Sequence, residues 1–114
     1  MSIELVDESA IYELKHQSGA VFFMKHWTFG MQDEVDRACI VQDGKGGFSY
    51  EFSKEREIKV RLAIHDWSGI NLNGEPTPCT PENKRRLPVG IVLWLVREID
   101  ERAGLKMPEQ EKKS

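Results

Sequence analysis

The side chains best suited to chemistry in this 114-residue chain are three histidines and two cysteines. His16, His26 and His65 fall on separate segments, and their separations match no spacing typical of metal ligands. Cys39 and Cys79 also lie far apart in the sequence, so neither a disulfide framework nor a zinc site is expected. No nucleophile, base and orienting group come together, and no pair of carboxylates has a catalytic pattern. We therefore expect no enzyme activity, no cofactor and no metal site.

Two motifs have the composition of anion-binding sites. The glycine-rich loop 43–47 lacks P-loop spacing and does not lead from a strand into a helix through Lys-Ser/Thr. The basic run Lys84-Arg85-Arg86 is only three residues long, and in an acidic protein such a run is typical of solvated surface. Phosphate binding is expected at neither motif.

The overall charge excludes some classes of partner. The formal net charge is −3 and the isoelectric point is near 5.6, whereas nucleic-acid and anionic-membrane binders normally carry a basic excess. The longest strongly apolar run, 89–96, is far shorter than the roughly 20 residues that span a bilayer. The first residues lack a basic region followed by an apolar run, so no signal peptide is expected. The composition predicts a soluble protein of the reducing cytoplasm.

The elements that would position any site begin with a predicted hairpin over 11–27, which turns at Gln17-Ser18-Gly19. On its second strand, Phe22 and Met24 alternate with other bulky residues, a pattern compatible with cover on both faces. From Met31 onward the apolar spacing becomes helical and predicts a short amphipathic helix that includes Cys39 on its apolar face. A cysteine placed there is more often a small core residue than a nucleophile.

The middle of the chain is ambiguous. A short β-like run covers 48–52, and Glu57 to Asp66 alternates strictly, with Ile58 and Val60 on one side and Lys59 and Arg61 on the other. This alternation predicts a strand, because a helix would place Ile58 and Val60 on different sides. A helix remains the serious alternative, since Lys, Arg and Glu favour helices.

The segment from Trp67 to Leu105 is the best specified. Asn73-Gly74 predicts a tight turn, and Thr80 followed by Pro81 predicts the start of a helix. Pro88 is expected at the first position of a longer apolar helix, which ends at Gly104 in a left-handed cap.

Together these patterns predict an α+β fold with an N-terminal β-hairpin, an amphipathic helix, further antiparallel strands and a C-terminal helix packed on the sheet. We expect a single domain over 1–105 and a flexible charged tail over 106–114.

Two tryptophans are informative. Trp67 ends the predicted strand before a glycine turn and is expected to anchor the core. Trp94 falls on the polar side of the C-terminal helix, where its ring would leave apolar surface exposed unless something covers it. A partner protein could cover it, because interfaces favour Trp, or the N-terminal segment or hairpin of the same chain could do so.

The chain resembles the tail assembly chaperone-like proteins of tailed bacteriophages and prophages. The resemblance covers about residues 31 to 104 and includes Trp67-Ser68-Gly69-Ile70, Asn73-Gly74-Glu75-Pro76, Thr80-Pro81-Glu82-Asn83 and Leu87-Pro88. It implies a non-enzymatic role in the host bacterial cytoplasm: holding the long tape measure protein in solution while tail-tube subunits are recruited. No catalytic residue is carried over.

Such a chaperone needs an apolar surface for its partner. We expect the C-terminal helix and the hairpin face to provide it, through Trp94, Leu95, Ile91, Phe22 and Met24. The alternative function is a structural tail completion or connector protein of the virion. The sequence leaves open whether the chain self-associates.

Overall fold

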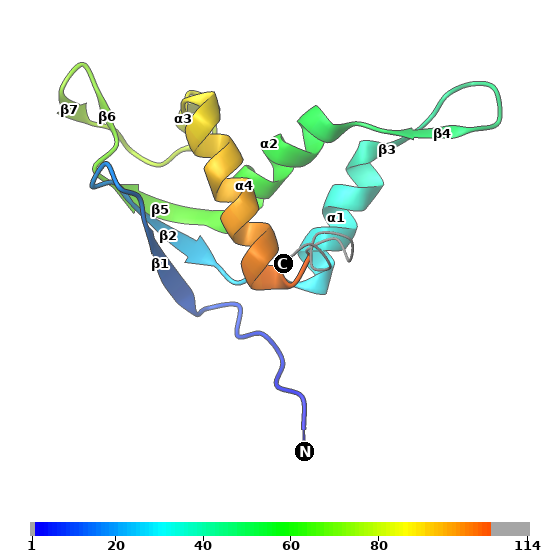
Figure 1. The fold of residues 1–114 in the computed structure, drawn as a ribbon, viewed down its shortest axis with the longest axis horizontal. Coiled ribbons are helices and arrows are strands. Elements are labelled where there is room, and N and C mark those ends of the chain that lie inside the picture. The colour runs from blue at the N-terminus through cyan, green and yellow to red at the C-terminus, as the bar shows by residue number, and fades with distance from the viewer. Residues whose placement is uncertain (1, 106–114) are drawn as a thin grey trace, which may run out of the picture.

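The computed structural model describes residues 2–105, and the predicted tail over 106–114 lies outside them. The fold is α+β, as predicted: an antiparallel sheet carries helix α4 on one face, and α2 runs from this body toward α1 (Figure 1). The elements in chain order are β1 (Ile11–Lys15), β2 (Val21–Lys25), α1 (Phe29–Cys39), β3 (Ile40–Gln42), β4 (Phe48–Tyr50), α2 (Phe52–Ala63), β5 (Ile64–Ser68), β6 (Asn71–Leu72), β7 (Glu75–Pro76), α3 (Pro81–Lys84) and α4 (Val89–Ala103).

The main sheet has three strands in the order β1-β2-β5, and both neighbouring pairs are antiparallel. The predicted N-terminal hairpin is confirmed, with Leu14 opposite Phe22 and a turn in which Gly19 has a φ of 101°. A register shift interrupts the pairing of β2 with β5 between Phe23 and Met24. Phe22 and Met24 are completely buried, whereas Phe23 is only half-buried on the other face.

The core lies between this sheet and α4. Leu95 and Ile99 of α4 are buried, and they belong to one cluster with apolar residues of all three strands. The predicted packing of the C-terminal helix on the sheet is therefore confirmed. The strand residues of this cluster are Leu14, Phe22, Met24, Ile64 and Trp67.

The strand predicted over Glu57 to Asp66 is wrong. Residues up to Ala63 form the helix α2, and only Ile64 onward is a strand. The alternation misled because α2 is buried on two sides. Ile58 packs in a small cluster with α1, while Val60 packs in the main core. A helix covered on both sides places apolar residues at several angles, which imitates the period of a strand.

Helix α1 is confirmed, and it starts two residues earlier than predicted. The Thr28 hydroxyl accepts a hydrogen bond from the Met31 backbone N–H at 3.1 Å and caps it. Val35 and Cys39 are buried on its inner face, so Cys39 is a core residue as expected. Beyond α1, the β3–β4 hairpin projects from the body (Figure 1).

The connection from β5 to α3 follows the predicted turn chemistry. Asn73 and Gly74 have φ values of 52° and 83° and join β6 to β7. The indole nitrogen of Trp67 donates a hydrogen bond to the Thr77 carbonyl oxygen at 2.7 Å, so the core tryptophan also fastens this loop. The Thr80 hydroxyl caps α3 by accepting from the Asn83 backbone N–H.

Helix α4 differs from its prediction by one residue at the start. Pro88 is the N-cap rather than the first helical residue, and it still has the φ of −57° that proline imposes. Gly104 ends the helix in the left-handed conformation, and the Leu105 N–H donates to the Asp100 carbonyl oxygen at 2.8 Å. No helix among residues 2–105 has the length and apolar character needed to cross a membrane.

Candidate functional site

Three of the five residues predicted to bind a partner are inaccessible. Phe22, Met24 and Leu95 are each 0% exposed in the core between the sheet and α4. Their apolar side chains hold the fold together and cannot reach a second protein while the domain stays folded. The prediction that these three residues contact a partner is therefore wrong for the folded domain.

Trp94 is partly covered by its own chain. Its ring lies edge-on to His16 with centroids 4.8 Å apart, and 6.1 Å from the ring of Phe22. The N-terminal hairpin, one of the two kinds of cover that the sequence left open, therefore contacts the ring and covers part of it. Trp94 and Ile91 are both half-buried against the core.

The histidines do not converge on a site. His16 lies against Trp94 and within hydrogen-bond distance of the Ser18 hydroxyl, whereas His26 lies against Tyr12. His65 is exposed on β5. Among residues 2–105, no group of three or more His, Cys, Asp or Glu side chains has a geometry that could hold a metal ion.

Both cysteines are free thiols in unreactive surroundings. Burial raises the pKa of Cys39, and burial likewise raises the pKa of Cys79, which is half-buried. A raised thiol pKa reduces the fraction of thiolate, which is the nucleophilic form.

The glycine-rich loop between β3 and β4 is closed by its own aspartate. One carboxylate oxygen of Asp43 accepts hydrogen bonds from the backbone N–H groups of Lys45 and Gly47, at 2.8 and 3.0 Å. The carboxylate therefore occupies the position in which a phosphate would meet these donors.

An apolar concavity of about 620 Å³ lies between α4 and the first turns of α2. We call it the α2–α4 groove. Its apolar lining consists of Phe52, Leu93, Val96 and Leu105. Phe52 is 66% exposed and Leu93 is 50% exposed. None of these four residues was predicted as partner-binding from the sequence, although the spacing of Leu93 and Val96 on one side of α4 was a visible signal.

A buried ion-pair cluster forms one wall of the α2–α4 groove. The Lys59 ammonium lies 2.7 Å from a carboxylate oxygen of Asp100 and 3.2 Å from one of Glu55. The Lys59 side chain is only 4% exposed. Because a buried charge needs such partners, this cluster fixes α4 against α2 and hence the width of the groove. The strand predicted from the sequence would place Lys59 on the side opposite Ile58 and Val60.

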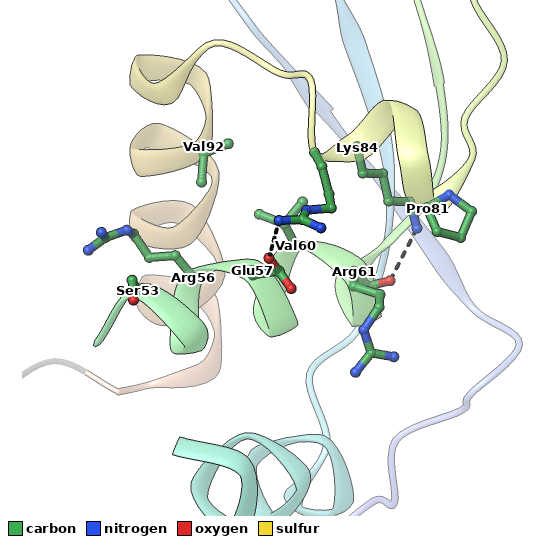
Figure 2. A pocket seen from close by; sticks show the side chains of 9 residues that line it. Ser53, Arg56, Glu57, Val60, Arg61, Pro81, Lys84 and Val92 are labelled. Atoms are coloured by element: carbon green, nitrogen blue, oxygen red, sulfur yellow. Dashed lines mark hydrogen bonds and ion pairs between the residues drawn. The ribbon is translucent and has the colours of Figure 1, made fainter. Parts of the chain in front are cut away.

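A second concavity, of about 290 Å³, lies between α2, α3 and α4 (Figure 2). We call it the α2–α3 pocket. The Lys84 ammonium donates to the backbone carbonyl oxygens of Arg61 and Ile64, at 3.1 and 2.8 Å, and so satisfies the C-terminal end of α2. Burial lowers the pKa of Lys84. Lys84 belongs to the basic run 84–86, which the sequence predicts as solvated surface, and in the structure it supports the end of a helix.

Comparison with known proteins adds no relative. No protein-family model, no curated protein and no solved structure matches this chain.

Proposed function

We propose that this chain is a non-enzymatic binding protein, a tail assembly chaperone of a bacteriophage or prophage, which holds an apolar helical segment of the tape measure protein in the α2–α4 groove. The observation that carries the proposal is the groove itself. It presents exposed apolar side chains from two helices that a buried ion-pair cluster joins.

The lining of the groove suits an amphipathic helix. Leu93 and Phe52 supply exposed apolar contacts from opposite walls, and Val96 lies one turn beyond Leu93 on α4. A helix that lays its apolar face into such a groove gains the burial that these side chains lack in the free chain.

The charges around the groove indicate what flanks that apolar face. The lining includes three carboxylates and two cations: Glu55, Asp100, Glu101, Lys59 and Arg97. The excess is negative, so a partner helix with lysine or arginine beside its apolar stripe is favoured. The assignment of this partner as the tape measure protein, with tail-tube subunits recruited afterwards, rests on the resemblance of residues 31 to 104 to tail assembly chaperones.

The test is co-expression of the chain with the tail proteins encoded beside its gene, followed by affinity capture and mass spectrometry of the bound chains and of purified virions. We expect capture of the long tape measure protein and absence of this chain from finished virions. The variant Leu93→Asp should reduce capture at least about tenfold, because it removes apolar contact and places a carboxylate in the interface.

The matched control is Leu72→Asp on β6, since Leu72 is 44% exposed and lies outside the groove. It should capture the partner as the wild type does. Equal capture by Leu93→Asp would overturn the proposed groove. Presence of the chain in virions at a fixed copy number would instead support a structural tail completion or connector protein.

A further inference from the structure

The segment before β1 contains apolar side chains that touch little of the domain. Residues 2–9, which we call the N-terminal arm, form no helix or strand. Ile3 and Leu5 are each 92% exposed. The hydrogen bonds observed in the arm are local, between Asp7 and Ser9 and from the Ala10 N–H to the Asp7 carbonyl oxygen. The arm thus presents Ile3 and Leu5, together with Val6, which is 42% exposed, to any surface that fits them.

The arm is also strongly acidic. It carries Glu4, Asp7 and Glu8 and no lysine or arginine. In an extended chain Ile3, Leu5 and Asp7 fall on one face, and Glu4, Val6 and Glu8 fall on the other. A complementary surface would therefore combine an apolar floor with positive charge at its edge.

The α2–α3 pocket has this combination. Its floor includes Val60, Val92 and Pro81, and its charged lining residues are Arg56, Arg61, Lys84 and Arg85 against the single acid Glu57. In Figure 2 the Arg61 side chain points away from Val60 and Val92, consistent with its ion pair to Glu34 on α1. The remaining charges are still positive in excess.

Arg56 is the cation best placed to accept a new partner. It is half-buried in the pocket, and within residues 2–105 it makes no ion pair and no side-chain hydrogen bond. The neighbouring pair of Arg85 with Glu57 is 3.4 Å long, with side chains 72% and 51% exposed. Such an exposed pair is weak, so Arg85 can exchange Glu57 for another carboxylate at little cost.

Charge also decides between the two concavities. The α2–α4 groove has more carboxylates than cations along its lining, so an acidic arm would meet repulsion there. Of these two concavities, only the α2–α3 pocket has an excess of positive charge along its lining.

The placement of the arm favours a second copy of the chain as its host. The arm leaves the domain at the Ile11 end of β1, whereas α3 lies at the opposite end of the molecule (Figure 1). Projecting away from its own pocket, the arm is free to enter the pocket of a neighbour. We propose that the N-terminal arm of one copy docks in the α2–α3 pocket of a second copy, with Ile3 and Leu5 on the apolar floor and the arm carboxylates beside Arg56 and Arg85.

This contact produces a dimer if two copies exchange arms, and a ring if the exchange passes from copy to copy. It goes beyond the proposed function and does not depend on it, because it concerns the chain alone.

The test measures the molar mass of the purified full chain by light scattering and sedimentation. At about 0.1 mM the wild type should be oligomeric, and its association should weaken as salt is raised. Deletion of residues 2–9 and the single variant Arg56→Glu should each raise the dissociation constant at least about tenfold. The matched control Arg37→Glu makes the same charge change on an exposed face of α1, where Arg37 pairs with Asp33, and should leave association unchanged.

A charge exchange gives the decisive comparison. A chain with Glu4→Lys, Asp7→Lys and Glu8→Lys should associate poorly with itself and should form mixed oligomers with the Arg56→Glu variant. A monomeric wild type, or an oligomer that survives deletion of the arm, would overturn the proposal. Circular dichroism of each variant checks that the fold is retained.

Discussion

The buried Lys59 cluster predicts an unequal response to the removal of its two ends. Asp100→Ala leaves a cation whose side chain is 4% exposed with Glu55, at 3.2 Å, as its carboxylate partner. Lys59→Met removes the buried charge itself and keeps an apolar stem of similar length. The two carboxylates then remain, with side chains 19% and 30% exposed, so both can reach water.

The magnitudes follow from this burial. Removing one partner of a fully buried ion pair costs about 3–5 kcal/mol, because the other charge stays buried without compensation. Glu55 supplies part of that compensation here, so we expect Asp100→Ala to lower the free energy of unfolding by about 2 kcal/mol. Replacement of a buried charge by a well-packed apolar side chain is often close to neutral, so Lys59→Met should cost less than about 1 kcal/mol.

The assay is urea denaturation followed by circular dichroism and tryptophan fluorescence. With a slope near 1–1.5 kcal/mol per molar urea for a domain of this size, Asp100→Ala should shift the midpoint by about 1.5 M at unchanged slope. Asp33→Ala is the control. Its ion pair with Arg37 has nearly the same length, 2.8 Å, but an arginine side chain that is 80% exposed, so the cost should stay below about 0.5 kcal/mol.

Two outcomes would refute this reasoning. One such outcome is that Lys59→Met destabilises the protein as much as Asp100→Ala does. The buried ammonium would then stabilise the fold by itself, and its carboxylate partners would do more than offset the cost of burying it. The other is that Asp100→Ala lowers the free energy of unfolding no more than Asp33→Ala does. Burial of Lys59 would then not make its ion pair more important for stability than the exposed pair of Arg37 with Asp33.

Three further predictions concern the backbone, the α2 terminus and the thiols. Gly69 has a φ of 76°, and a Cβ added there would lie 3.1 Å from the Ala20 Cα, so Gly69→Ala should lower the urea midpoint by an amount equivalent to about 1–3 kcal/mol. Lys84→Met removes two charged hydrogen bonds to backbone carbonyls and should cost about 2 kcal/mol at pH 7. Because burial lowers the pKa of Lys84 in the folded state, the unfolded chain binds more protons than the folded chain as the pH approaches 10.5. The stability of the wild type relative to Lys84→Met should therefore increase when denaturation is repeated at rising alkaline pH. Iodoacetamide at pH 8 should modify the half-buried Cys79 slowly, and Cys39, which is 0% exposed, only after unfolding. Peptide mass spectrometry measures both, and rapid labelling of Cys39 in the folded protein would contradict its burial.

Local chemistry along the sequence determined the hairpin, the turns and the helix ends. Asn73-Gly74 forms the predicted tight turn, Thr80 caps the helix that begins at Pro81, and Gly104 ends α4 in the left-handed conformation. Each of these features depends on the backbone preferences and hydrogen-bond needs of residues a few positions apart, which the sequence displays directly.

Tertiary structure decided what is buried and what is available to a partner. Residues 57–63, which the sequence predicts as part of a strand, belong to helix α2, and α1 and the main core cover this helix on two sides. Trp94 is half-buried rather than exposed because His16, far away in the sequence, comes to lie against its ring.

The candidate sites were hidden from the sequence for the same reason. Lys59 and Asp100 are 41 positions apart, and no local pattern marks them as partners. The α2–α4 groove and the α2–α3 pocket likewise join side chains of helices that are distant in the chain. Sequence could supply the hairpin, the turns and the caps of α3 and α4, because those are set by neighbours along the chain. Which faces close on one another, and which remain open for binding, depends on packing between distant segments and so appeared only in the folded structure.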